Sequence, residues 1–181
     1  MSGALSYSSG ESATPLLGDT IGGNFDATVL AFGDREALVD RSDPRSGRRW
    51  TYAQLAADVD ALALGLLEMG IAKGDRVGIW APNYAEWTLT QYATAKIGAI
   101  LVNINPAYRT RELEFVLNQS GTKLLVSAVK LKTSDYAAMI AEVRPRCPRP
   151  ISRSACQSGL PISTTCARPG QRGRTSAIIA A

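Results

Sequence analysis

The chain has 181 residues, which is enough to bury one hydrophobic core, and a single folded domain is therefore expected. Its net charge of +4 arises in residues 145–181, which hold six arginines and no acidic residue. The other 14 of the 20 basic residues and all 16 acidic residues lie in residues 1–144, whose net charge is −2. A slightly acidic body excludes a domain-wide attraction for nucleic acid, and the lack of histidine excludes histidine-based catalytic triads.

The cysteines and the apolar residues indicate neither a metal site nor a membrane protein. Cys147, Cys156 and Cys166 are spaced by nine and ten residues, a pattern typical of neither zinc ligands nor a disulfide framework. The N-terminus lacks a basic segment followed by an apolar run, and no apolar stretch approaches the roughly 20 residues of a membrane span. We expect no metal, no transmembrane segment and a cytoplasmic location.

The chain begins with a segment that predicts no regular structure. Residues 1–15 are rich in serine, glycine and alanine, and we expect them to form a flexible leader. The next segment carries Ile21, Phe25 and Val29 at a spacing of four residues. This spacing predicts a helix whose apolar side docks on the rest of the domain.

A hairpin and a long amphipathic helix are predicted next. Residues 37–39 and 48–51 flank a turn-rich segment, which is typical of an antiparallel hairpin with a long loop. Thr51 and Gln54 have the spacing of a capping box, and Gly70 is placed to end the helix that follows. The apolar side of this helix is predicted to carry Leu55, Val59, Leu62 and Leu66.

The segment Gly74–Pro106 predicts the strand–helix–strand unit around which the rest of the domain is organised. Val77, Ile79 and Trp80 form a short apolar run, typical of a strand buried on both faces. Residues 99–102 predict a second buried strand. Two such strands joined by a helix are expected to be parallel, with a right-handed crossover.

The helix of this unit is expected to run from Tyr84 to about Ile97. Asn83 is predicted to be its N-cap, and Glu86 is spaced to complete a capping box. The same two residues are candidates for polar site residues, but capping accounts for both. Gly98 is placed to end the helix in the left-handed conformation.

After this unit the pattern of alternating helices and strands continues. Residues 110–121 predict a short helix, residues 123–128 a third buried strand, and residues 134–143 a further helix. Alternation of this kind predicts the α/β class, with a mostly parallel sheet flanked by helices. Residues 145–181 contain five prolines and no aromatic residue, and we expect a disordered tail.

Several short motifs resemble the opening of the AMP-forming acyl-CoA synthetases, the adenylating enzymes that also include luciferases. The resemblance covers residues 16–144, and the sequence around Asn105-Pro106 is most similar to that of fatty-acid–CoA ligases. This segment is therefore identified as part of the N-terminal domain of such an enzyme. The motifs are Thr51–Leu55, Gly70-Ile71, Gly74–Val77, Ala81–Asn83, Ala95–Pro106 and Tyr108-Arg109.

The resemblance implies ligation of a carboxylate to coenzyme A through an acyl-adenylate, with ATP and Mg²⁺. Full-length members use a Ser/Thr/Gly-rich phosphate loop, a magnesium-binding glutamate, a ribose-binding aspartate and a C-terminal lysine. None of these motifs is present: Gly22-Gly23 precedes Asn24 with no strand before it, and Thr164-Thr165 is followed by Cys166 rather than by a glycine and a lysine. We therefore expect no catalytic, cofactor-binding or metal-binding residue in this chain, no cofactor of its own and no activity alone.

Some residues have two interpretations that the sequence leaves open. Lys96 could contact a phosphate, although stabilisation of the C-terminal end of a helix is the better explanation. Trp80 and Trp87 could line an acyl pocket, although buried packing is favoured. Tyr108 and Arg109 could face the active site of the full enzyme or lie on a surface loop. An RNA-binding role for the arginine-rich tail is disfavoured, because the tail lacks interleaved aromatic residues.

Two hypotheses for the whole chain follow. The first is a truncated ligase, inactive alone, in which residues 16–144 are a partial AMP-binding domain and residues 145–181 are the product of a frameshift. Its support is a tail composition typical of a G+C-rich gene read out of frame. The second is a stand-alone binding or assembly module that pairs with a separate chain carrying the rest of the ligase.

Overall fold

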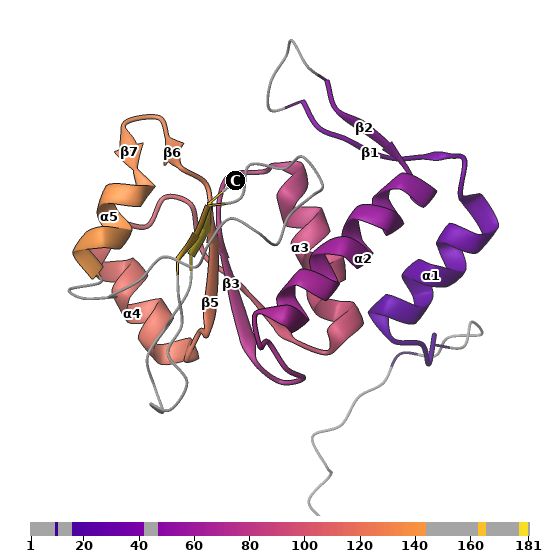
Figure 1. Ribbon diagram of the computed structural model, residues 1–181, viewed down its shortest axis with the longest axis horizontal. Coiled ribbons are helices and arrows are strands. Elements are labelled where there is room, and N and C mark those ends of the chain that lie inside the picture. Colours follow the sequence, from indigo (N-terminus) through magenta and orange to yellow (C-terminus); the bar gives the residue numbers. More distant parts are fainter. Residues whose placement is uncertain (1–9, 11–15, 42–46, 144–162, 166–177, 181) are drawn as a thin grey trace, which may run out of the picture.

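The computed structural model describes residues 10, 16–41, 47–143, 163–165 and 178–180, and the last two segments by their backbone alone. Helices and strands alternate through most of this part of the chain (Figure 1). The helices are α1 (Ile21–Phe32), α2 (Tyr52–Glu68), α3 (Ala85–Ile97), α4 (Thr110–Ser120) and α5 (Tyr136–Val143). The strands are β1 (Glu36–Val39), β2 (Arg49–Thr51), β3 (Arg76–Trp80), β4 (Ile100–Asn103), β5 (Leu124–Ser127), β6 (Lys130–Leu131), β7 (Ser134–Asp135), β8 (Ser163–Thr165) and β9 (Ile178–Ala180).

The main sheet has the strand order β4-β3-β5-β9-β8. β3 pairs in parallel with β4 on one side and with β5 on the other, and only β8 runs antiparallel to its neighbour. The prediction of an α/β fold with a mostly parallel sheet is thereby confirmed. β1 and β2 form the predicted antiparallel hairpin, whose loop residues 42–46 lie outside the described residues.

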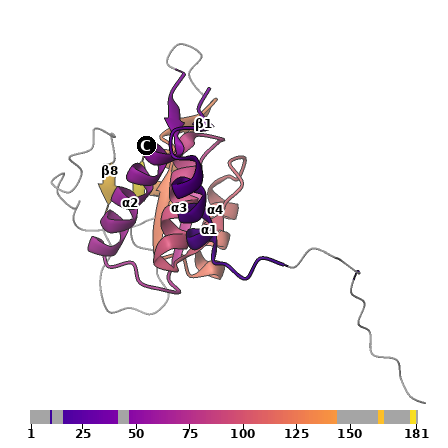
Figure 2. The ribbon, with the colours of Figure 1, turned by 90° about the vertical axis from the view of Figure 1, so that its right-hand side faces the viewer.

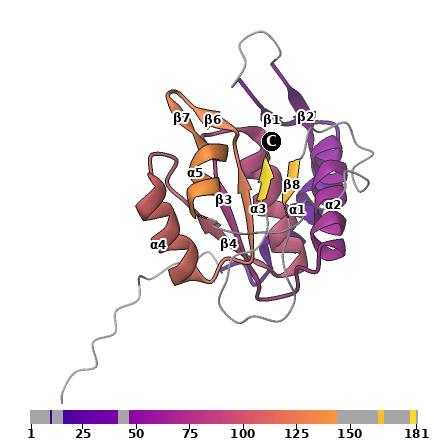
Figure 3. The ribbon, with the colours of Figure 1, turned by 60° about the vertical axis from the view of Figure 1, so that its left-hand side comes forward.

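Helices cover both faces of the sheet. α1, α2 and α3 lie together on one face, with α1 outermost (Figure 2). α4 and α5 pack on each other and lie on the opposite face (Figure 3). The sheet core between them is fully buried, as expected for a parallel sheet with two covered faces: Val77, Ile79, Leu124 and Leu125 are at most 1% exposed.

Most of the predicted helix ends are correct. The capping box of α2 is present, because Gln54 N–H donates to Thr51 Oγ1 (3.3 Å) and Thr51 N–H donates to Gln54 Oε1 (2.9 Å). Gly98 follows α3 with a φ of 71°, and Gly121 follows α4 with a φ of 61°. Both glycines are needed there, since a side chain at such a positive φ is strained.

Two predicted elements differ from the structure. The sequence predicts that β4 is buried, but in the part of the sheet that the structure describes it is an edge strand, and its first residue, Ile100, is 52% exposed. Continuous apolar residues cannot distinguish a central strand from an edge strand, because position in the sheet depends on pairing partners far away in sequence. The helix expected over residues 134–143 begins only at Tyr136. Ser134 and Asp135 instead pair with Lys130 and Leu131 as the small hairpin β6–β7.

The C-terminal segment predicted to be disordered lies mostly outside the described residues. Its described parts are β8 and β9, and β9 extends the main sheet beyond β5. The leader predicted for residues 1–15 is described only at Gly10. Among the helices that the structure describes, none is long and apolar enough to cross a membrane.

Candidate functional site at the carboxyl ends of the strands

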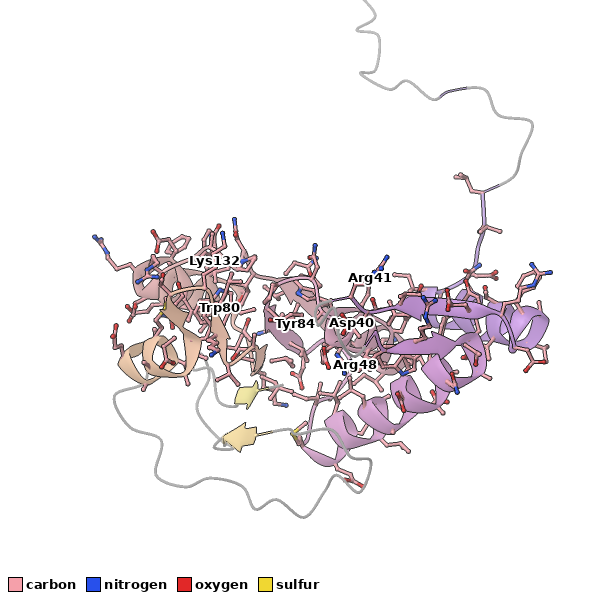
Figure 4. The ribbon with its side chains drawn as sticks, turned by 90° about the horizontal axis from the view of Figure 1, so that it is seen from above. Asp40, Arg41, Arg48, Trp80, Tyr84 and Lys132 are labelled. Carbon is pink, nitrogen blue, oxygen red and sulfur yellow. The ribbon has the colours of Figure 1, made fainter. Side chains whose placement is uncertain are left out.

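The candidate site follows from the topology of the sheet. Because β3, β4 and β5 are parallel, their carboxyl ends lie at one edge, which also carries the β1–β2 and β6–β7 hairpins (Figure 1). The chain leaves β3 toward α3 on one face, but leaves both neighbouring strands toward the opposite face. In open parallel sheets, ligands bind where successive connections diverge in this way. We refer to the ends of these three strands, the residues that follow them and the adjacent β1–β2 hairpin as the carboxyl edge (Figure 4).

An aromatic stack forms the centre of the carboxyl edge. Trp80, the last residue of β3, stacks on Tyr136 of α5 with ring centroids 3.8 Å apart. Both side chains are fully buried, and both donate hydrogen bonds to the loop after β4: Trp80 Nε1 to the Asn105 carbonyl oxygen (3.0 Å) and Tyr136 Oη to that of Pro106. Burial, together with the nearby phenol of Tyr84, raises the pKa of Tyr136, so its hydroxyl remains a donor.

Trp87 is also held by a backbone contact. Its side chain is half-buried on α3, and its Nε1 donates to the Ala81 carbonyl oxygen at 2.9 Å. Both tryptophans that were candidates for an acyl pocket therefore have packing and hydrogen-bonding roles in this chain. The role of Tyr136 could not be read from the sequence, since it depends on α5 meeting the end of β3.

Glu86 does not cap α3, and the predicted capping box is wrong. The N-cap position is Tyr84, which makes no capping hydrogen bond through its side chain. Instead Glu86 binds the guanidinium of Arg48 from the β1–β2 hairpin, at 2.9 Å and 3.2 Å, and Arg48 also binds the buried carboxylate of Asp40 at 2.6 Å. Figure 4 shows Arg48 and Asp40 together beside Tyr84. The Arg48 guanidinium donates two charge-assisted hydrogen bonds to the Glu86 carboxylate, whereas a capping box would supply one, from a backbone N–H.

Lys96 connects the three helices on one face of the sheet. Its Nζ lies 2.7 Å from Asp26 Oδ1 of α1 and 2.5 Å from Asp60 Oδ1 of α2, and 5.6 Å from the ring centre of Phe25. Burial alone would lower the pKa of Lys96, but the two carboxylates raise it above its usual value. Lys96 is in the last turn of α3, as its predicted helix-end role requires, and its contacts are structural.

Tyr108 and Arg109 lie in the loop before α4. Tyr108 is 36% exposed, and Arg109 Nη1 donates to Ser134 Oγ at 2.7 Å. The Arg109 N–H donates to Glu112 Oε2 at 3.1 Å, which begins α4. These contacts favour the surface-loop interpretation, and they connect the loop after β4 with the β6–β7 hairpin.

The residues considered for a phosphate loop are not placed as one. Over residues 16–41 and 47–143, no group of three or more histidine, cysteine, aspartate or glutamate side chains could hold a metal ion. Gly22 and Gly23 lie in the first turn of α1 rather than in a loop after a strand, and Thr164 and Thr165 belong to β8. At the carboxyl edge, side chains of Trp80, Trp87 and Tyr136 are instead bonded to backbone carbonyl oxygens.

Comparison with known proteins identifies the family. The sequence model described as AMP-binding enzyme matches residues 25–170. The mitochondrial medium-chain acyl-CoA ligase ACSF2 of Macaca fascicularis is 45% identical over 79% of this chain, which is 23% of that protein. ACSF2 of Mus musculus is 42% identical over 90% of this chain and 26% of its own length. The chain thus spans about a quarter of the length of the curated relatives it matches.

Solved structures agree with the sequence relatives. The fatty acyl-CoA synthetase of Mycobacterium tuberculosis superimposes with a TM-score of 0.62 and 32% identity, over 70% of this chain and 24% of that one. The N-terminal domain of FACL13 from the same organism gives 0.63 and 32%, over 71% and 31%. The family match continues past residue 144, where the resemblance noted from the motifs ends. The chain belongs to the AMP-binding enzyme family, and it corresponds to the N-terminal part of that family's acyl-CoA ligases.

Proposed function

We propose that this chain is the N-terminal scaffold of an AMP-forming fatty-acid–CoA ligase and does not form acyl-adenylates by itself. The observation that carries the proposal is the carboxyl edge, which is built from packed side chains and backbone contacts. Its tryptophans, Glu86 and Arg48 hold loops and the hairpin in place. A fatty acid is proposed as the carboxylate because ACSF2 is described as a medium-chain acyl-CoA ligase.

The proposal is tested with the purified chain, ATP, Mg²⁺, coenzyme A and fatty acids from four to sixteen carbons. Pyrophosphate release is measured beside a full-length acyl-CoA ligase as the positive control. We expect no release above a blank without protein. Turnover at an ordinary synthetase rate of about 1 s⁻¹ or more would overturn the proposed inactivity. The cytoplasmic location stays a prediction, since the mammalian relatives are described as mitochondrial.

A second candidate is an assembly module that pairs with a separate chain carrying the rest of the ligase. Its support is the set of large apolar side chains left exposed: Leu30 is 90%, Leu64 62% and Phe115 64% exposed. Leu30 and Leu64 belong to the helices on one face of the sheet and Phe115 to α4 on the other, so a partner chain would have to cover both faces. The candidate predicts that a tagged copy of this chain co-purifies with a ligase chain that starts after the matched segment. It also predicts that pyrophosphate release appears only when both chains are present.

The origin of residues 145–181 is a separate proposal. The family match extends to residue 170, past the change in composition near residue 145. The protein sequence therefore does not locate a frameshift, and the gene sequence is needed. Translation of the gene across codons 140 to 181 in all three frames provides this test. A frame that continues into a phosphate loop with its lysine would support the frameshift, and its absence would contradict it.

A further inference from the structure

The outer edge of β5 is the side that faces away from β3. Without a partner strand there, the main sheet would end at β5. β5 has β3 on one side, and all four of its residues are buried. On its other side lies β9 from the C-terminal end of the chain, drawn in yellow in Figure 3. The two strands are parallel, with Leu125 opposite Ile178, Val126 opposite Ile179, and Ser127 opposite Ala180. β8 then pairs with β9 in the antiparallel sense.

An uncovered β5 edge would be prone to pairing with other chains. Charged residues, proline and glycine normally discourage edge-to-edge pairing, and Leu124–Ser127 contains none of them. Two β-branched residues stand opposite it, Ile178 and Ile179, and residues of this type favour extended backbone. Within the described residues, β4 at the far edge of the sheet pairs with β3 on one side only. Its other side therefore serves as a comparison for an edge without a cap.

We infer that Ile178–Ala180 is a built-in cap for the outer edge of β5. The chain completes its own sheet at this edge instead of accepting a strand from a second copy or from another protein. Because the cap belongs to the same polypeptide, its effective concentration is high, on the order of millimolar, and an incoming strand must displace it. The cap is independent of the proposed ligase function, since it requires only the backbone register of β5 and β9.

Disulfide trapping in the full-length chain tests the cap directly. The three natural cysteines are first replaced by serine, and Ser127→Cys is combined with Ala180→Cys. Neighbouring strands lie about 4.8 Å apart, within the range of Cα separations that a disulfide spans. The matched control combines Ser127→Cys with Ser163→Cys, two strands away at about 9.6 Å, which exceeds the limit of about 7 Å.

The cap predicts that the first pair forms an intramolecular disulfide under mild oxidation, detected by mass spectrometry of the linked peptides, and that the control pair does not. Equal oxidation of both pairs, or of neither, would overturn the proposal. A disulfide between two chains would also overturn it and would identify a second copy as the occupant of the edge.

Hydrogen exchange provides a second readout. Ile179→Pro removes an N–H donor from β9, whereas the control Ile179→Val keeps the backbone and the branched side chain. We expect the amide of Val126, which faces β9, to exchange at least tenfold faster in the proline variant, while the amides of Leu125 and Ser127, which face β3, stay protected. Unchanged exchange in β5 would contradict the cap. Disulfide trapping remains decisive if the proline variant unfolds altogether.

Discussion

The indole of Trp80 and the phenol ring of Tyr136 stack with their centroids 3.8 Å apart and their planes 8° from parallel. The pair joins the end of β3 to α5, and each ring donates a hydrogen bond to the loop that follows β4. Three connections at the carboxyl edge are therefore fixed by two side chains that lie 56 positions apart in the sequence. The loop after β4 is thereby held against the end of β3 and against α5.

Tyr136→Phe is predicted to lower the free energy of unfolding by about 1 kcal/mol, because it removes one buried hydrogen bond and leaves the Pro106 carbonyl unpaired. Tyr136→Ala also removes the ring and is predicted to cost about 3–5 kcal/mol. Urea unfolding monitored by circular dichroism measures both. Tyr108→Phe is the control at a more exposed ring, with an expected change within about 0.5 kcal/mol. Equal stability of Tyr136→Phe and the unchanged protein would show that the bond adds nothing.

Glu86→Gln is predicted to loosen the β1–β2 hairpin, because Arg48 loses its bidentate carboxylate and keeps only Asp40. We expect a loss of about 1 kcal/mol and faster hydrogen exchange in β1 and β2. Glu36→Gln is the matched control: its pair with Arg49 is exposed on both sides, and its loss is expected to cost about 0–0.5 kcal/mol.

Asn83→Ala tests whether Asn83 is the N-cap of α3, as the sequence predicts. Because Asn83 is not the N-cap of α3, this substitution is predicted to change stability by less than about 0.5 kcal/mol. A loss of about 1 kcal/mol or more, typical of a lost cap, would restore the capping interpretation.

Lys96→Met is predicted to destabilise the three-helix face by about 1–2 kcal/mol, because it removes the cation between Asp26 and Asp60 while keeping an apolar stem. The loss should shrink at high salt, since both carboxylates are more than half exposed and are screened. Thermal unfolding at low and high salt measures it. Lys130→Met, at an exposed lysine, is the control and is expected to be neutral. A salt-independent loss would mean that packing rather than charge is responsible.

Gly22→Ala and Gly65→Ala form a matched pair of helical substitutions. A Cβ at Gly65 meets nothing within 4 Å, so alanine there is predicted to stabilise α2 by about 0.5–1 kcal/mol. A Cβ at Gly22 would lie 3.3 Å from Lys96 Cα, where α1 approaches α3 closely. There the gain in helix propensity is predicted to be cancelled or reversed. Equal stabilisation by both substitutions would show that the close approach relaxes freely.

Asp75 is predicted to make stability depend on pH in the acid range. Its partial burial alone would raise its pKa, but hydrogen bonds from Lys123 Nζ and the Ala72 N–H bring the pKa below its usual value. A lowered pKa in the folded state means that the unfolded chain binds the proton first. The stabilisation is therefore complete above the unfolded pKa of about 3.9 and is lost as the pH falls through the folded pKa.

Asp75→Asn tests this assignment. The variant is expected to be less stable at pH 7 and to lose less stability than the unchanged protein between pH 5 and pH 2. Asp34→Asn, at an exposed aspartate, is the control for the change of charge. Parallel profiles for Asp75→Asn and the unchanged protein would show that Asp75 is not the group responsible.

Local patterns in the sequence determined most of the elements of this protein. The Thr51–Gln54 capping box, the glycines after α3 and α4, and the apolar runs of β3 and β5 act within a few residues of one another, and each was predicted correctly. The family resemblance was visible for the same reason, since its motifs are short and contiguous.

Tertiary structure decided what connects these elements. The sequence places Glu86 three residues after Asn83, which is the spacing of a capping box, whereas its actual partner, Arg48, is 38 residues away. The exposure of β4 and the stacking of Trp80 on Tyr136 likewise depend on strand order and on which helix meets which strand end. Spacing along the chain specifies on which face of a helix or strand a side chain lies. The residue that it contacts is decided by packing, because its possible partners belong to segments far away in the sequence.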